Sequence, residues 1–451
     1  MLETTKRHFS ILLMLTFVSG IALFGGLVQA HSARGIILDY RIVYIGARCL
    51  IRHCDLYSEA DVMSVYVAEG GVRVPSAQDG RSLHYVAAQQ IYPPTAELFF
   101  APFALLPWRS AYALWASLTC GLMTLAAFLM WDAARPYACD LPFYLACIVL
   151  INSGILFSGA NPAGIAVSLC VISVWCIFHE RYLTIGMLCM AASLAIKPHD
   201  SGLVWLYLFL VGGAIRKRAI QSLMVVAILG IAAVAWISQV SPHWIQEMRA
   251  NLVRYSTNGS TNDPAGSTAG MMVNLQAVIA VFRGDARFYN FAAYAICAPL
   301  FLVWVFVTVR NRRTQKGTWL GLAAIAALSL LPLYHRPHDA KILLLTLPAC
   351  AALWAEGGSI AWMALAFTGA GILVTSDLPL ALLRMHQSAL PAATGIKGEL
   401  LLVLTTRPAA LVLLATSIFY LWAYVRYLRD KRADAAVTPG FETPDSVPQL
   451  K

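Results

Sequence analysis

Long runs of apolar residues alternate with short polar breaks along most of the chain. A helix needs about 20 apolar residues to cross the roughly 30 Å hydrocarbon core of a bilayer. The pattern therefore predicts an all-α fold, a polytopic transmembrane bundle of about twelve spans. The runs cover residues 10–28, 110–131, 139–157, 163–178, 182–196, 201–215, 219–238, 288–309, 317–333, 340–355, 359–376 and 402–425.

Polar stretches divide the chain into parts with different expected environments. The first loop is long and polar in its middle, and the tail contains proline and few apolar residues, so we expect the tail to be disordered. The predicted parts are a cytoplasmic N-terminus with the first span (1–30), the first extracytoplasmic loop (31–108), the transmembrane bundle (109–432) with further loops at 239–287 and 377–400, and the tail (433–451).

The first apolar run has two interpretations. Lys6, Arg7 and His8 precede it, which favours a cytoplasmic amino end. Val28-Gln29-Ala30 resembles a signal-peptide cleavage site, but the run is long for a signal core. We therefore favour an uncleaved anchor over a removed signal peptide.

Basic residues in the short loops fix the predicted orientation. Lys and Arg accumulate in the short cytoplasmic loops of membrane proteins. Alternating the loops along the chain places the three long loops on the extracytoplasmic face. The residues assigned to the cytoplasmic side are Arg135, Arg181, Arg216, Lys217, Arg218, Arg310, Arg312, Arg313, Lys316, Arg426, Arg429, Lys431 and Arg432.

An amphipathic helix is predicted in the loop 239–287. Ser241-Pro242 has the form of an N-cap followed by proline at the first helical position. Apolar residues then recur at helical spacing, which is typical of a helix lying on the membrane. They are Trp244, Ile245, Met248 and Leu252. The sequence STNGSTNDPAGSTAG that follows predicts a mobile segment, either a lid or a plain linker.

Composition agrees with a membrane protein and limits its partners. Hydrophobic residues make up 59% of the chain and charged residues 12%, far from the balance of a soluble domain. The net charge of +10 comes from short clusters between apolar runs. Anionic lipids are therefore the expected counter-charges, and nucleic acid is not an expected partner.

Ten cysteines are present, and most lie inside apolar runs, where they pack as small hydrophobic residues. Cys49 and Cys54 lie in the first loop. Five residues apart on a helix they would point in different directions, so the sequence favours leaving them unbridged.

Unusual polar residues concentrate on the predicted extracytoplasmic face. They occur at four separate turns: Asp39, Asn161-Pro162, Lys197-Pro198-His199-Asp200 and the loop from Tyr334 to Asp339. Ionisable groups at that depth are costly unless they face water or one another. We therefore expect the four turns to share one cavity.

Asp39 is the candidate general base of this cavity. Its alternative role is to cap the helix that follows it. On a helical wheel Arg41, Arg48 and Arg52 share one face, free to meet solvent or headgroups, and Asp39 lies on the opposite face toward the bundle. The wheel favours the catalytic interpretation.

The Tyr334–Asp339 loop and Lys197 suit a phosphate. Arg336 binds phosphate as a fork, His335 and His338 can bind or protonate it, and Lys197 adds a point charge. The alternative is that these side chains reach to lipid headgroups from an ordinary interfacial loop. The histidines lack a recognised metal-ligand spacing, so we expect no metal and no other cofactor.

These motifs together resemble glycosyltransferase family 87 of the GT-C superfamily. The resemblance extends from the first span to about residue 355. It is carried by Asp39, Tyr44, Ala47, Asp55-Leu56-Tyr57, Tyr92-Pro93-Pro94, Pro102, Leu106-Pro107, Asn161-Pro162, Lys197-Pro198 and the Tyr334–Asp339 loop.

The resemblance implies a GT-C-like membrane enzyme of the bacterial inner membrane whose site faces the periplasm. It implies transfer of a hexose, mannose in the known family, from a polyprenyl phosphate to a lipid or glycan acceptor, with inversion and with an acidic residue of the first loop as base. Asp39 takes that role, with Lys197, His335, Arg336 and His338 at the donor phosphate. The expected cavity residues are Tyr44, Tyr57, Tyr92, Asn161, His199 and Tyr334.

Three other functions remain open from the sequence. A transporter or flippase for lipid-linked sugars or anionic lipids would have a similar cationic cavity, although the internal repeat common in transporters is not visible. An envelope-polysaccharide polymerase or ligase is a second enzyme class. A non-catalytic relative that retains the scaffold is the third.

Overall fold

The computed structural model describes most of the chain, and all of its regular elements there are helices. The all-α prediction is therefore confirmed for the described part. The described residues are 2–32, 39–71, 90–180, 182–256, 260, 262–266, 268–310, 314–379 and 395–437, so much of the predicted tail lies outside them.

The helices follow the chain in three groups. The first group is α1 (Leu2–Ser32), α2 (Asp39–Ile51), α3 (Glu59–Ala68), α5 (Pro94–Ala104) and α6 (Trp108–Ala134). The second is α7 (Asp140–Ile151), α8 (Gly154–Gly159), α9 (Pro162–Phe178), α10 (Leu183–Ile196), α11 (Pro198–Val211), α12 (Gly213–Val240) and α13 (Trp244–Ser256). The third is η1 (Ala269–Met271), α14 (Leu275–Phe282), α15 (Ala286–Arg310), α16 (Gln315–Ser329), η2 (Asp339–Thr346), α17 (Leu347–Trp354), α18 (Gly358–Val374), α20 (Gly395–Thr406) and α21 (Pro408–Val437).

Five helices are long and apolar enough to cross a membrane: α1, α6, α12, α15 and α21. The shorter apolar helices α7, α9, α10 and α18 add to them, but about twelve full spans are not shown. Several predicted runs are divided in the structure. Run 139–157 breaks between α7 and α8, and run 340–355 begins as a 3₁₀ helix. At 1.5 Å per residue these pieces are shorter than the hydrocarbon core.

The long helices differ in how much the rest of the protein covers them. In the most apolar windows of α12 and α15, 17% and 22% of the residues are buried, compared with 56% in α6. A helix that is apolar all round and largely uncovered is stable when lipid surrounds it. The protein is therefore an integral membrane protein.

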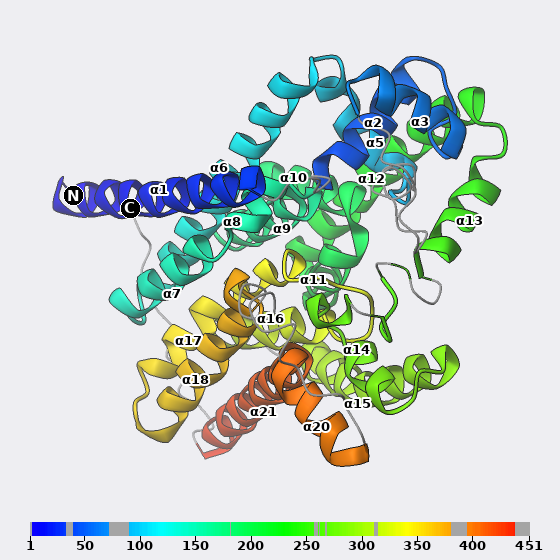
Figure 1. Ribbon diagram of the computed structural model, residues 1–451. Helices are drawn as coiled ribbons and strands as arrows, with labels where there is room; N and C mark the ends of the chain where they lie inside the picture. Colours follow the sequence, from blue (N-terminus) through cyan, green and yellow to red (C-terminus); the bar gives the residue numbers. More distant parts are fainter. Residues whose placement is uncertain are drawn as a thin grey trace.

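A helical cap, formed by α2, α3, α5 and α13, lies at one end of the bundle (Figure 1). Its core is aromatic, and the ring of Tyr40 stacks on Trp115 with centroids 4.9 Å apart. The predicted amphipathic helix is found here as α13. Its Asn251 is buried and donates to the backbone carbonyl of Tyr57, whereas Ile245 remains 51% exposed.

The arginines of α2 do not form the free basic face that the helical wheel predicts. Arg48 Nε lies 3.0 Å from Glu69 Oε1, and Arg52 contacts the same oxygen. The guanidinium of Arg41 lies 5.0 Å from the ring centre of Trp108. The expectation was wrong because Glu69 follows α3, and the fold returns it to α2.

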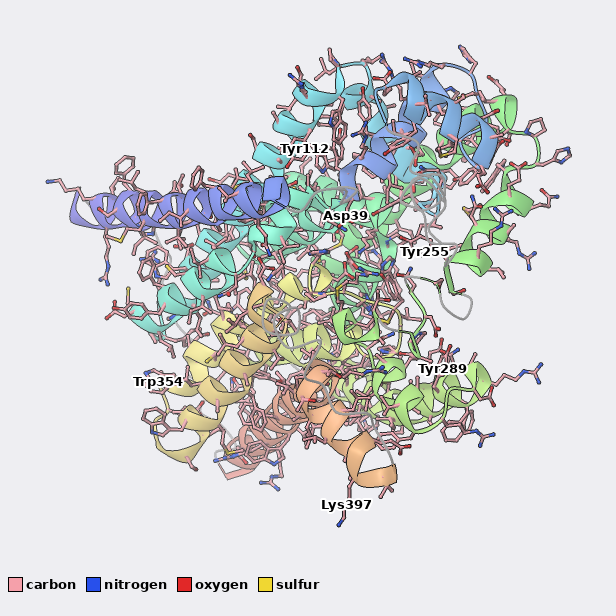
Figure 2. The ribbon with its side chains drawn as sticks, viewed as in Figure 1. Asp39, Tyr112, Tyr255, Tyr289, Trp354 and Lys397 are labelled. Atoms are coloured by element: carbon pink, nitrogen blue, oxygen red, sulfur yellow. A yellow bond between two sulfur atoms is a disulfide. The ribbon has the colours of Figure 1, made fainter. Side chains whose placement is uncertain are left out.

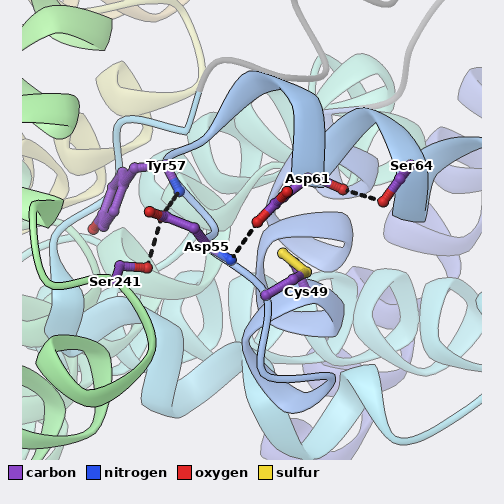
Figure 3. The surroundings of a disulfide bond; sticks show 7 residues. Cys49, Asp55, Tyr57, Asp61, Ser64 and Ser241 are labelled. Carbon is purple, nitrogen blue, oxygen red and sulfur yellow. Dashed lines mark hydrogen bonds between the residues drawn. A yellow bond between two sulfur atoms is a disulfide. The ribbon is translucent and has the colours of Figure 1, made fainter.

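Cys49 and Cys54 form a disulfide, contrary to the prediction (Figure 3). The prediction assumed a continuous helix, but α2 ends at Ile51. His53 adopts a left-handed conformation with φ 59°, and the amide of Cys54 then donates to the carbonyl of Cys49 over 3.1 Å. This turn brings the two Cα atoms to 5.1 Å, within disulfide range.

Ser241 connects the cap to α12 and does not cap α13 as predicted. Its hydroxyl donates to Asp55 Oδ1 over 2.6 Å, next to the disulfide (Figure 3). Helix α13 therefore begins at Trp244, three residues later.

The end of α1 packs directly on the backbone of α8. A Cβ atom built on Gly26 would lie 2.1 Å from the carbonyl oxygen of Gly154, so only glycine allows this approach. At the other end of α1, His8 Nε2 lies 3.2 Å from Asp132 Oδ1 of α6. Helix α1 is therefore held toward both of its ends, by α6 and by α8.

Candidate functional site

Three of the four predicted polar turns meet at Asp39, the first residue of α2. Asn161 Nδ2 donates a 2.8 Å hydrogen bond to Asp39 Oδ2, and His338 Nε2 lies 3.6 Å from the same oxygen. The side chain of Asp39 is 43% exposed, whereas that of His338 is 11% exposed. Figure 2 shows Asp39 between the helical cap and the bundle. A carboxylate is thus held by buried neighbours and open on one side.

Asn161 is positioned by the start of α9. Its Oδ1 accepts a 2.8 Å hydrogen bond from the amide of Ala163, and Pro162 occupies the first helical position. Asn-Pro is a strong helix start, because the side chain caps an amide and proline needs no partner for its nitrogen. With Oδ1 engaged by the helix, Nδ2 is directed at Asp39.

Lys197, at the junction of α10 and α11, forms a buried charge group with Asp200 and Asp339. Its Nζ donates to Asp339 Oδ1 and lies 3.4 Å from Asp200 Oδ2. Burial lowers the pKa of Lys197, but the two carboxylates outweigh this and raise the pKa above its usual value. Burial opposes ionisation of Asp339, yet Lys197 and the nearby histidines hold its pKa below the usual range. Much of the lysine charge is thus balanced inside the protein.

Arg336 lies in the loop before η2 and contacts neutral oxygen atoms. Its Nε donates to the hydroxyl of Tyr334, and its Nη2 donates to Asn262 Oδ1 over 3.2 Å. Burial lowers the pKa of Arg336, but Tyr334, Tyr255 and the Asp39 carboxylate raise it further, so the group stays charged. Arg336 therefore places a positive charge near the Asp39 carboxylate.

The histidines of this loop are neutral at physiological pH. Burial lowers the pKa of His338, and the carboxylates of Asp39 and Asp339 only partly offset this. Burial likewise lowers the pKa of His335. These rings can orient or exchange protons, but they do not add positive charge for a phosphate.

The other predicted site residues lie in different places. Tyr92 belongs with the site, because burial raises the pKa of its hydroxyl while Lys197 and Asp39 also act on it. His199 and His335 face Asp200 in a separate group.

Tyr44 and Tyr57 lie in the cap. The Tyr44 hydroxyl donates to the carbonyl of Leu106, and that of Tyr57 donates to the carbonyl of Tyr92. Both side chains are buried in the core of the cap, and no contact with Asp39 is present among the described residues. The hydroxyl of Tyr57 binds the backbone of Tyr92. Neither Tyr44 nor Tyr57 lines the site as the motif predicted.

Three residues near the site, Tyr255, Asn262 and Asp377, were not candidates from the sequence, whereas Asp339 belongs to one of the predicted polar turns. Asp377 Oδ2 accepts a hydrogen bond from the amide of Ile155 and acts electrostatically on His338. Asn262 and Tyr255 surround Arg336, and Asp339 pairs with Lys197. Asn262 lies in the segment predicted to be mobile, yet it is 8% exposed. A Gly, Ser and Thr-rich composition carried no signal for this contact.

Comparison with known proteins decides the family. The family model described as glycosyltransferase family 87 matches residues 91–333, just over half of the chain. The chain belongs to glycosyltransferase family 87. The resemblance read from the motifs is thus confirmed, and membership in family 87 implies a membrane glycosyltransferase. No curated protein and no solved structure matches the chain.

The family 87 match covers only part of the site. It includes Tyr92, Asn161 and Lys197, but Asp39 and the loop from 334 to 339 lie outside it. The contact between Asp39 and Asn161 therefore connects a residue outside the matched region to one inside it.

Proposed function

We propose that this protein transfers a hexose, mannose in the first instance, from a polyprenyl phosphate to a hydroxyl group of a lipid or glycan acceptor. Asp39 is the general base, and the site faces the extracytoplasmic side of the bacterial inner membrane. The observation that carries the proposal is the Asp39 carboxylate, partly exposed and held by Asn161 at 2.8 Å. An exposed, positioned carboxylate is what deprotonation of an acceptor hydroxyl requires.

The reaction is a single displacement. The acceptor oxygen attacks the anomeric carbon while Asp39 takes its proton, and the bond from that carbon to the phosphate oxygen breaks. The bonding electrons leave with the polyprenyl phosphate, and the configuration at the anomeric carbon inverts. The contacts of Asp39 with Asn161 and His338 both use Oδ2, which leaves Oδ1 for the acceptor.

Arg336 is the main candidate for binding the donor phosphate. A guanidinium binds phosphate oxygens as a fork and stabilises the charge that develops on the leaving group. Lys197 contributes only if the phosphate shares it with Asp339 and Asp200. The leaving phosphate is a good anion, so cationic stabilisation can replace a general acid.

The lipid-linked nature of the donor is supported by the position of the site. Helix α1 ends shortly before Asp39, and many of its side chains, including Phe17 and Phe24, are exposed. Such a surface is stable only against lipid. A donor with a polyprenyl chain can remain in the bilayer while its sugar reaches the site.

The test is transfer of labelled mannose from polyprenyl phosphate mannose by the purified protein. Asp39→Asn removes the base but keeps the shape, so we expect activity to fall by about 10²–10⁴-fold. Asp285→Asn is the matched control, because Asp285 is half exposed and pairs with Arg283. This control should retain full activity.

Full activity of Asp39→Asn would contradict the proposed mechanism. Movement of the lipid-linked sugar across proteoliposomes, without any new glycosidic bond, would instead indicate a transporter. Both variants should melt within a few degrees of the wild type, which separates lost chemistry from lost folding.

A further inference from the structure

His199, Asp200 and His335 place three possible metal ligands within 4.8 Å of one another. His199 Nε2 and His335 Nε2 lie 3.5 Å and 3.6 Å from Asp200 Oδ1. In tetrahedral coordination with bonds of 2.0–2.1 Å, ligand atoms lie about 3.3 Å apart. The two distances to the carboxylate are close to this value, and the two imidazole nitrogens, which lie within 4.8 Å of each other, would approach to bind the same small divalent ion.

The hydrogen bonds of His335 favour the tautomer that binds metals. Its Nδ1 lies 3.2 Å from the carbonyl oxygen of Leu333, which can only accept, so Nδ1 carries the proton. Nε2 is left with a lone pair directed at the Asp200 carboxylate. Metal-binding histidines commonly donate their other ring N–H to a backbone carbonyl in this way.

Three buried polar atoms of the group make no hydrogen bond among the described residues. His335 Nε2 and both carboxylate oxygens of Asp200 are buried and accept no hydrogen bond there. Both side chains are fully buried. Buried lone pairs that face one another are costly, and a bound cation would satisfy all of them.

The local charge also favours a cation. Two carboxyl groups, those of Asp200 and Asp339, lie within ion-pairing distance of the same cation, Lys197. Lys197 Nζ lies near Asp200 Oδ2, on the other oxygen from the one that faces the imidazoles.

We infer that His199, Asp200 and His335 form a binding site for a divalent transition metal of the zinc class. Two imidazole nitrogens and one carboxylate oxygen are a known ligand set for this class, with a fourth position open to water. The ion would join the first turn of α11 to the loop that carries Arg336 and His338. It is a positioning element behind the site and is independent of the proposed transfer reaction.

The test is metal binding by the purified full-length protein, stripped with a chelator and then dialysed against Zn²⁺. Elemental analysis should give one zinc ion per chain, and Zn²⁺ should raise the melting temperature. Cobalt in place of zinc should give the visible absorption of a tetrahedral complex. His335→Gln and His199→Gln should each weaken binding at least tenfold.

His243→Gln is the matched control, since His243 is exposed at the start of the segment leading to α13. It should bind zinc as the wild type does. If His335→Gln fails to fold, the more exposed His199→Gln still provides the comparison. Absence of stoichiometric zinc, or equal binding by the ligand variants, would overturn the inference and indicate that a proton lies between Asp200 and the imidazoles.

Discussion

Asn161 joins two parts of the molecule through one amide group. Its oxygen caps α9, and its nitrogen donates to the Asp39 carboxylate. Replacing either the amide oxygen or the amide nitrogen of Asn161 therefore removes one of these two contacts. The sequence Asn-Pro could predict the cap, but the bond to Asp39 crosses 122 residues and has no local signature.

Substitutions at Asn161 should separate these two contacts. Asn161→Ser keeps a capping oxygen but cannot reach Asp39, so stability should change by less than about 0.5 kcal/mol while transfer falls about tenfold. Asn161→Asp keeps the cap and sets a second carboxylate against Asp39. We therefore expect the acidic limb of its pH–rate profile to move to higher pH, because like charges disfavour ionisation.

Rates and melting temperatures of the two variants test this. Asn161→Ala, which loses both contacts, is the reference and should lose about 1 kcal/mol of stability. Wild-type rates for Asn161→Ser would show that the bond to Asp39 has no role in catalysis.

Glu97 of α5 is a buried carboxyl group without a hydrogen-bond partner among the described residues. Burial raises its pKa from the ordinary value of 4.5 to about 8. Between these values the unfolded chain releases a proton that the folded protein keeps. The contribution of Glu97 to stability is therefore greatest below about pH 4.5 and falls as the pH rises toward 8.

Glu97→Gln should remove this dependence. The variant and the wild type should melt alike near pH 4.5, and the variant should be more stable at pH 8 by a few kcal/mol, since each pKa unit corresponds to about 1.4 kcal/mol. Melting curves in detergent across this range give the difference. Glu59→Gln, on a half-exposed glutamate of α3, should follow the wild-type profile. If the stability of Glu97→Gln changed with pH in the same way as that of the wild type, Glu97 would have an ordinary pKa.

The position of a residue could be predicted from the sequence where its immediate neighbours along the chain determine it. Asp39 follows an apolar run, and Lys197 precedes a proline at the start of a helix, so both could be assigned to the same end of the bundle. Glu97 lies in an apolar stretch that the sequence pattern treats as a connection. Its burial depends on how α5 packs against other elements, which no local pattern encodes.

At the scale of elements, the ion pair of Lys197 and Asp339 joins the α10–α11 junction to the start of η2. The two residues are 142 positions apart, and both are nearly buried. Removing one partner of a buried pair leaves an uncompensated charge. The contact should therefore be one of the larger contributions to holding the site together.

Asp339→Asn should lower stability by about 3 kcal/mol. The triple variant Lys197→Met, Asp200→Asn and Asp339→Leu should recover much of the loss, because none of the three buried charged groups is left. The wild type should also lose this contribution in acid. The pKa of Asp339 is held low in the fold, so the contribution is complete above the ordinary pKa near 4 and is lost as the pH falls below it. Melting of all the variants at neutral pH and pH 3 tests both statements, and equal stability of Asp339→Asn and wild type would contradict them.

The sequence pattern could predict that the long helices exist, but it could not predict where every helix ends. Helices α6, α12 and α15 match long uninterrupted apolar runs, so their existence could be predicted. The end of α2 at Ile51 and the return of Cys54 to Cys49 depend on one left-handed residue, His53. A histidine is uncommon there, and the assumption of a continuous helix therefore placed the cysteines wrongly. The arginines were placed wrongly because Glu69, which follows α3, pairs with them.

At the scale of the whole molecule, two groups of charged contacts stand out, one around Asp39 and Lys197 and the other around Asp132. The first group also holds Asn161 and Arg336. Helix α1 carries the chain from the second group, where His8 contacts Asp132, toward Asp39. The basic short loops predict that the His8 end is cytoplasmic.

Reporter fusions test this orientation. Alkaline phosphatase inserted after Gly70, next to the end of α3, should be active because it is exported. The same enzyme fused to the C-terminus should be inactive, and a fluorescent protein fused there should fluoresce. The opposite pattern would place the site in the cytoplasm and remove the extracytoplasmic part of the proposal.

The distance along the chain between Asp39 and its partner also sets an order of events during synthesis. Asn161 is added 122 residues after Asp39. At about 5–20 residues per second, Asn161 is added roughly 6–24 s after Asp39, and His338 is added later still. A ribosome that stops before His338 releases a chain that contains Asp39 and Asn161 but lacks His338. The group around Asp39 is therefore complete only after most of the bundle has been synthesised.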